Sequence, residues 1–258
     1  MPGLTAFNTA DVVAAGNLMP FYKSNLLLAV MLPADLELMR TVLRPVELQQ
    51  GTMLYDVGDK IASVYFPWNC VVSMVVGLST GELVEAAMVG RDGVVGALAA
   101  LDGKVSLTRA IVQVGGRSAM CDVDAFKRVA LQNTTILSLM LSHEQTVYAQ
   151  AQQSVACNIS HDVTARLSRW LLRARDLSGS DVLPFTQEFL AEMLGVRRTS
   201  VSPAANDLQR MGLIKYTRGK IQITDLAGLK ATACECYETV RGYYDHLIGV
   251  NAPSGNID

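Results

Sequence analysis

Apolar positions in the C-terminal third of the chain repeat with helical spacing in two adjacent segments. The first segment follows Thr186, a good N-cap residue, ends at Gly195, and places on one face Phe189, Leu190, Met193 and Leu194. The second segment ends at Gly212 and repeats every three or four positions through Val201, Ala204, Ala205 and Leu208. Two short helices joined by a tight turn predict a helix-turn-helix, whose second helix enters a DNA major groove.

A strand-like pattern follows directly. Residues 213–216 and 221–224 are short apolar runs on either side of a turn that contains Arg218 and Lys220. This pattern predicts a β-hairpin with a cationic turn, and a helix pair followed by a basic hairpin is typical of a winged helix-turn-helix. The predicted DNA contacts are Arg197, Arg198, Thr199, Ser200, Ser202, Arg218 and Lys220.

Short β-rich runs precede this module, and Gly, Asp, Asn and Pro separate them at intervals of about 8–12 residues. They cover residues 46–48, 53–55, 63–66, 70–76, 83–89 and 110–114. Such spacing predicts an antiparallel barrel or sandwich. Two helical segments, 21–32 and 34–43, come before it, and residues 1–19 show no sustained period, as expected for an arm or a disordered end.

The longest helical pattern covers residues 133–158. Its apolar stripe consists of Leu137, Leu141, Tyr148, Ala151 and Val155. At 1.5 Å per residue, about 25 residues extend for nearly 40 Å, which is too long to bury against one small barrel. We therefore expect this helix to pair with its own copy in a homodimer.

A final helix is predicted over residues 226–248, with Asp225 as its N-cap. It either packs as core or adds a second dimer contact. The chain is thus predicted to be α+β, with a jelly-roll barrel domain at 20–132, a dimerisation helix at 133–158, a winged helix-turn-helix at 159–225 and a C-terminal extension at 226–258.

Charge is distributed unevenly along the chain. The 258 residues carry a net charge of −2 and a pI near 5.9. Residues 163–220 nevertheless hold ten Lys and Arg against five Asp and Glu, so this segment carries +5 and the remainder −7. A basic module in an acidic chain is typical of a sequence-specific regulator.

The five cysteines are odd in number and scattered, with no signal peptide ahead of them, so a cytoplasmic location is expected. No apolar run reaches membrane-spanning length. Cys234 and Cys236 form a C-x-C in a helical pattern, where the two thiols point to different faces. Without two more ligands nearby, no metal site is expected there, and no cofactor is expected.

The order of barrel, long helix, helix and winged helix-turn-helix resembles the Crp/Fnr superfamily of bacterial transcription regulators over about residues 25–225. The strongest pieces are LQQGTMLYDVGDKIASVYF at 48–66 and FTQEFLAEMLGVRRTSVS at 185–202. The resemblance implies a sensor domain similar to a cyclic-nucleotide-binding domain. It also implies a homodimer on a near-palindromic site in double-stranded DNA, with RNA polymerase as a further partner.

The sensor departs from the pattern of cyclic-AMP-binding members, where a Gly-Glu pair holds the ribose and an Arg-Ser or Arg-Thr pair some ten residues on holds the phosphate. Asp92 and Arg109 are the candidates here, but the gap is longer and Ala110 follows the arginine. We predict that cyclic AMP is not the effector, although a cyclic-nucleotide-responsive regulator stays the alternative. Clustered N-terminal cysteines for an iron–sulfur sensor are missing, and the possible haem ligands Cys70, His143 and His161 stand outside any ligand spacing.

The reading helix also departs from the family pattern. Where better-known members place Arg, Glu and Arg, this chain has Arg198, Thr199 and Pro203, so its target sequence should differ. Ser202 and Pro203 locally resemble a helix start, whereas the family pattern begins near Arg198, and we expect one helix with a loosened first turn. A cupin-like enzyme would need clustered histidine and carboxylate ligands; the three histidines, at 143, 161 and 246, lie in helical stretches, so no enzyme is expected.

Overall fold

The computed structural model describes residues 4–5, 22–103 and 105–249, so most of the predicted N-terminal arm lies outside the described residues. Two short helices, α3 (Leu26–Ala29) and α4 (Pro33–Arg40), follow the first strand and come before all the others. Pro33 opens α4 because its fixed φ suits the first helical position and its missing N–H has no partner to lose there.

The N-terminal domain is a sandwich of two four-stranded antiparallel sheets. The first sheet has the order β1 (Leu4–Thr5), β2 (Arg44–Leu48), β8 (Gly116–Asp122) and β4 (Ser63–Pro67). The second has the order β3 (Met53–Tyr55), β7 (Arg109–Val114), β5 (Val71–Gly77) and β6 (Leu83–Val89). Among the described residues the two sheets share no ladder of hydrogen bonds, so the predicted jelly roll is present as two separate sheets and not as a closed barrel.

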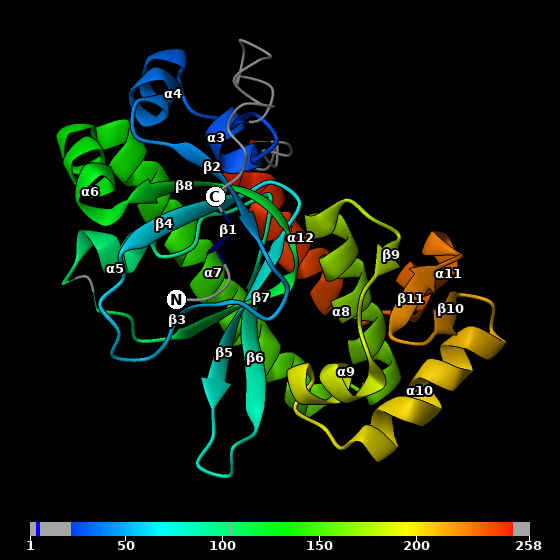
Figure 1. The fold of residues 1–258 in the computed structure, drawn as a ribbon. Coiled ribbons are helices and arrows are strands. Elements are labelled where there is room, and N and C mark those ends of the chain that lie inside the picture. Colours follow the sequence, from blue (N-terminus) through cyan, green and yellow to red (C-terminus); the bar gives the residue numbers. More distant parts are fainter. Residues whose placement is uncertain (1–3, 6–21, 104, 250–258) are drawn as a thin grey trace, which may run out of the picture.

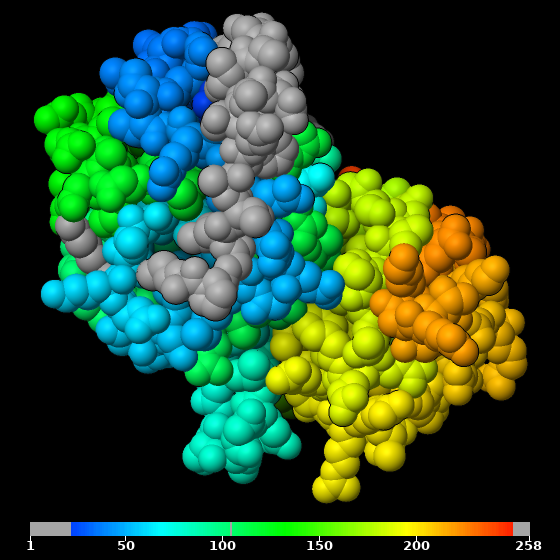
Figure 2. All heavy atoms as spheres, in the orientation of Figure 1, coloured from blue at the N-terminus to red at the C-terminus, as the bar shows by residue number. Residues whose placement is uncertain are grey.

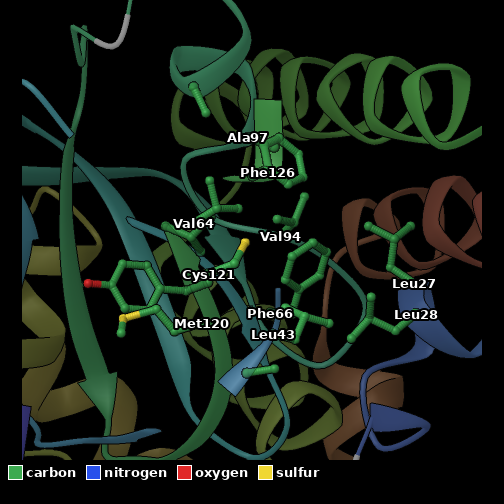
Figure 3. Packing of buried hydrophobic residues seen from close by; sticks show 14 of the residues in the cluster. Leu27, Leu28, Leu43, Val64, Phe66, Val94, Ala97, Met120, Cys121 and Phe126 are labelled. Carbon is green, nitrogen blue, oxygen red and sulfur yellow. The ribbon is translucent and has the colours of Figure 1, made fainter. Parts of the chain in front are cut away.

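Apolar side chains from both sheets and the flanking helices fill the sandwich. Phe66 of β4 lies 6.4 Å, centroid to centroid, from Phe126 of α6 (Val123–Gln132). Figure 3 shows these rings together with Leu27 and Leu28 of α3. Helix α5 (Ala97–Leu101) covers the same core.

The long helix α7 spans Thr134–Ser160, close to the predicted 133–158, and begins at the N-cap Asn133, whose side chain accepts hydrogen bonds from two amides of the first turn. One face of α7 is buried through Ile136, Met140, His143, Gln150 and Cys157. Figure 1 shows α7 running behind the sandwich toward the C-terminal module. In the part of the chain that the structure describes, no helix has the length and apolar content to cross a membrane.

The C-terminal module begins with α8 (Val163–Ser178). Helices α9 (Gln187–Met193) and α10 (Arg198–Arg210) follow, and then a three-stranded sheet in the order β10 (Ile214–Thr217), β11 (Lys220–Ile223) and β9 (Val182–Leu183). The module packs beside the sandwich, and the β5–β6 hairpin reaches α9 (Figure 1).

The C-terminal extension differs from its prediction as a single helix. Asp225 caps a short helix, α11 (Leu226–Thr232), as expected, but the chain becomes extended at Ala233 and a second helix, α12 (Cys236–Leu247), follows. Because of this break, α12 turns back to pack on α7 and α8. The bend also determines where Cys234 and Cys236 lie.

Candidate nucleic-acid interface

The helix pair is held by an aromatic cluster and by caps. Phe185 lies 4.8 Å from Trp170 of α8 and stacks on Phe189 of α9 at 5.0 Å between centroids. The Thr186 side chain accepts a hydrogen bond from the Phe189 amide at 3.1 Å, as its predicted N-cap role requires. Gly195, with φ of +62°, then turns the chain into α10.

Helix α10 buries one face and exposes the other. Its buried residues are Val201, Ala204, Ala205 and Leu208, which are those of the predicted apolar stripe. The opposite side of its first turn exposes Arg197, Arg198, Thr199 and Ser200, with Ser202 half-buried beside them. Among the described residues, Arg197 and Arg198 have no ion pair, so both guanidinium groups are available to a ligand.

The structure shows where α10 begins relative to Pro203. The helix begins at Arg198 and includes the proline, as the family pattern predicts. Its first turn is irregular: the Ser200 amide donates to the Arg197 carbonyl at 2.8 Å, and the Val201 amide reaches that carbonyl only at 3.4 Å. The Ser202 hydroxyl, 2.7 Å from Gln187 Oε1, joins this turn to α9.

The wing is the β10–β11 hairpin. Thr217 pairs with Lys220 across a two-residue turn in which Gly219 has φ of +77°. Arg218 and Lys220 are exposed at this tip, and Lys215 is exposed on β10. Figure 2 shows the surface of α10 and the wing on the side of the molecule away from the sandwich.

The basic segment is less uniform than its count of ten cations indicates. Three of them, Arg166, Arg169 and Arg173, are buried in α8, and Arg175 is paired with Asp181 at 2.6 Å. These arginines belong to the interior and to local ion pairs. The exposed cations therefore lie in the helix pair and the wing, namely Arg197, Arg198, Arg210, Lys215, Arg218 and Lys220.

The structure does not bring the two candidate effector residues together. Arg109 forms two hydrogen bonds with Asp56, at 2.8 and 2.7 Å, on the half-exposed side of β7. Asp92 is buried and binds Arg173 of α8 at 2.6 Å, and the Arg173 guanidinium also lies 4.1 Å from the ring centroid of Tyr244 on α12. Arg109 and Asp92 therefore have different partners, and Asp92 connects the sandwich to the C-terminal module.

A cavity of about 430 Å³ lies between the second sheet, α5 and α7. Its lining is mainly apolar, with Met74, Val89, Val95, Leu98, Val147 and Tyr148, and neither Arg109 nor Asp92 reaches it. One polar group in its wall is His143, which is fully buried. Its Nε2 accepts from the Val94 amide at 3.2 Å, while its Nδ1 has no hydrogen-bond partner among the described residues.

The predicted dimer stripe lies on the outer side of α7. Leu141, Tyr148 and Val155 are 52%, 65% and 62% exposed, and the other two members of the stripe, Leu137 and Ala151, are half-buried. These residues follow one another at steps of three, four or seven, the spacing of a coiled-coil seam. Glu144, a half-buried residue in the same row, also lines the cavity.

The structure also corrects the expectation that Cys234 and Cys236 lack further ligands. The break between α11 and α12 brings both thiols to Cys157 and His161 at the end of α7, and the four ligand atoms lie within 4.8 Å of one another. Spacing could have drawn attention to Cys157 and His161, because residues four apart share one face of a helix. Nothing local in the sequence places them beside a C-x-C more than seventy residues later.

Comparison with known proteins agrees with this architecture. Residues 165–232 match the family model of the Crp-like helix-turn-helix domain. No curated protein sequence matches the chain.

Solved structures match most of the chain. One CRP-family transcriptional regulator of Thermus thermophilus has 22% identity, covers 72% of this chain and 95% of its own, and gives a TM-score of 0.60. Another regulator of the CRP/FNR family from that organism has 23% identity, covers 74% of this chain and 98% of its own, and gives a TM-score of 0.59. The c-di-GMP-responsive global regulator CLP of Xanthomonas campestris has 15% identity, covers 74% of this chain and 99% of its own, and gives a TM-score of 0.58. At these identities the match establishes a common fold.

Proposed function

We propose that this protein, which combines a Crp-like helix-turn-helix domain with the fold of Crp/Fnr-family regulators, is a sequence-specific DNA-binding transcription regulator that acts as a homodimer. The observation that carries this proposal is the first turn of α10, where Arg197 and Arg198 are exposed and form no ion pair with any residue that the structure describes. Arginine is suited to this position because its guanidinium donates two hydrogen bonds to O6 and N7 of guanine in the major groove. Thr199, Ser200 and Ser202 border the same surface.

Within this proposal the wing contacts phosphate. Arg218 and Lys220 lie at a hairpin tip, and such cations attract the DNA backbone without reading its sequence. The two copies of α10 in a twofold dimer would meet half-sites one helical turn apart, about 34 Å, so the operator should be nearly palindromic. The dimer seam consists of Leu137, Leu141, Tyr148, Ala151 and Val155.

The proposal assigns one function to each part of the chain. Residues 20–132 form the sensor, 133–158 the dimerisation helix, 159–225 the DNA-binding domain and 226–258 the extension. We place the regulator in the cytoplasm with RNA polymerase as a partner, as the family resemblance implies, and assign it no catalytic role.

The effector site in this proposal is the apolar cavity against α7. A cyclic phosphate needs a cation and several donors, but the Arg109 guanidinium is paired with Asp56 outside the cavity. A largely apolar ligand fits the lining better, and His143 and Glu144 are polar residues that it would meet there. Because Tyr148 and Ala151 border both the cavity and the proposed seam, a bound ligand would act directly on the dimer.

The wing provides a test of the DNA-binding assignment. Replacing Arg218 and Lys220 together by alanine should weaken binding to specific and random duplexes alike, and should reduce the slope of log affinity against log salt by about 2. Fluorescence anisotropy at several salt concentrations measures both quantities. The matched control is Arg210→Ala, which removes an exposed cation that is already paired with Asp207 at 2.7 Å. An unchanged salt slope in the wing variant would contradict the assignment.

A further inference from the structure

A cluster of three cysteines and one histidine lies where α7 ends and α8 begins. Cys157 and His161 occupy the last turn and the C-cap of α7, Cys234 lies in the extended link after α11, and Cys236 is the first residue of α12. We infer that these four residues bind one Zn²⁺ ion, which fastens the C-terminal extension to the junction between the dimerisation helix and the DNA-binding domain.

The distances suit a tetrahedral ion. The sulfur atoms of Cys157 and Cys234 are 3.6 Å apart, and Cys236 Sγ is 3.6 Å from His161 Nδ1. Two thiolates at 2.3 Å from a tetrahedral zinc lie about 3.8 Å from each other. All four ligand atoms lie within 4.8 Å of one another, as they must when each binds the same ion. Three sulfurs and one imidazole form a ligand set that structural zinc sites use.

The histidine is already oriented as a ligand. Its Nε2 lies 3.1 Å from the Glu235 carboxylate, while its Nδ1 faces the thiols. Metal-bound histidines commonly donate their second ring N–H to a carboxylate, which fixes the ring and leaves the other nitrogen free for the metal. The Gln153 side chain, whose Nε2 donates to Cys236 Sγ at 3.1 Å, supports a second ligand in the same way.

Nearby charge favours an anionic centre. Arg166 and Arg169 are buried on α8, and the Nε of each has no hydrogen-bond partner among the described residues. Arg166 interacts electrostatically with Cys157 and Cys234, and Arg169 interacts electrostatically with Cys157. Buried cations are costly unless an opposite charge lies near. Zinc with three thiolates and a neutral imidazole carries one net negative charge, whereas three neutral thiols offer none.

The position gives the ion a defined structural effect. His161 has extended φ and ψ of −117° and 147°, and it separates α7 from α8, whose N-cap is Asp162. Coordination would therefore hold the hinge residue itself. It would also hold the link between α11 and α12, two helices that pack on α8 and α7 respectively. When the ion binds, the three thiol protons pass to solvent.

The test uses the full-length protein, purified without oxygen and in the presence of Zn²⁺ alone. We expect one zinc per chain by elemental analysis, and a thiolate–metal absorption band after Co²⁺ replaces Zn²⁺. His161→Gln and Cys236→Ala should lose the stoichiometric ion. Glu235→Gln should keep it with about 10–100-fold weaker affinity, measured by competition with a zinc chelator.

Matched controls come from the same chain. His246→Gln changes an exposed histidine of α12, and Cys121→Ala changes a buried thiol of the sandwich, so both should retain one zinc. Because His161 is only partly buried, its variant should fold, and far-ultraviolet circular dichroism checks this. Zinc retained by His161→Gln and Cys236→Ala, a Cys157–Cys234 disulfide found by mass, or an iron–sulfur spectrum with no zinc would each overturn the inference.

Discussion

Arg198 occupies the first position of α10, where it is exposed and has no ion pair within the described part of the chain. Replacing it by alanine should cost about 1–3 kcal/mol on the preferred operator, because one base pair loses its bidentate contact, and should relax preference at that position. Anisotropy titrations of specific and random duplexes measure the difference. An equal loss on both kinds of DNA would show that Arg198 contacts phosphate and not a base.

Glu85 couples the sandwich to α8. The Trp170 indole donates to its carboxylate at 2.8 Å, and the Ser73 hydroxyl bonds to it as well. Burial raises the pKa of Glu85 from its ordinary 4.5 to about 7, although Arg169 and Arg173 act in the opposite direction. Between about pH 4.5 and pH 7 the folded protein keeps a proton on Glu85 that the unfolded chain releases. The free energy of unfolding therefore falls as the pH rises through this range, and Glu85 contributes no further change above about pH 7.

Glu85→Gln should remove this pH dependence, which amounts to about 1–3 kcal/mol for this half-buried carboxyl. Urea unfolding of both proteins at pH 5 and pH 8 measures it. Relative to the wild type, the variant should become more stable at the higher pH. If the free energies of unfolding of the two proteins differed by the same amount at pH 5 and pH 8, Glu85 would be ionised throughout.

At the scale of single residues, local sequence signals were sufficient for some predictions and not for others. The Thr186 and Asp225 caps and the apolar stripe of α10 are local features, and the structure contains them. The partners of Asp92 and Arg109 depend on contacts between segments 53 to 81 residues apart, which no periodicity encodes. The cysteine quartet depends on a helix break that the sequence pattern did not reveal.

Among the elements, α7 carries the proposed dimer interface. Tyr148 is 65% exposed on a row with Leu141 and Val155, an unusual exposure for three large side chains on one helix. Glutamate at Leu141 or Tyr148 would place a charge in the seam, so it should dissociate the dimer and abolish tight DNA binding together. Light scattering and anisotropy measure the two effects.

Ser142→Glu is the matched control, because Ser142 is exposed but lies about 100° round the helix from Leu141. This variant should stay dimeric with full DNA affinity. If the seam variants also remained dimeric with unchanged affinity, the interface would have to lie elsewhere, for instance on α12.

The elements themselves were predicted in part. The strands of the sandwich follow the β-rich runs and α7 follows its long periodic stretch, because both patterns are local. Strand β8 was not foreseen, and the order of strands within the two sheets was not predicted, since pairing partners such as Arg44 and Met120 lie far apart in sequence. The break at Ala233 lacks a glycine or proline to mark it.

Across the whole molecule, the sandwich is connected to the C-terminal module by α7 and by the contacts of α8 with β5 and β6. Cyclic AMP should give no binding signal in the micromolar range in calorimetric titration of the dimer, because the Arg109 guanidinium is paired with Asp56 and the described residues of the cavity lining include no lysine or arginine. Cyclic GMP should behave in the same way. A micromolar signal that disappears in Arg109→Ala would contradict the apolar-ligand proposal.

The central claim, that two copies of α10 read a symmetric DNA sequence, is tested most directly by selection of bound duplexes from a random pool with the purified dimer. We predict enrichment of a near-palindrome whose half-sites are centred about 34 Å apart, with two chains per duplex by light scattering. The sequence should differ from the operator of the best-known relatives, because Thr199 and Pro203 replace their Glu and second Arg. Retention of random DNA with no enriched sequence, or enrichment of a single asymmetric half-site by one chain, would contradict the account.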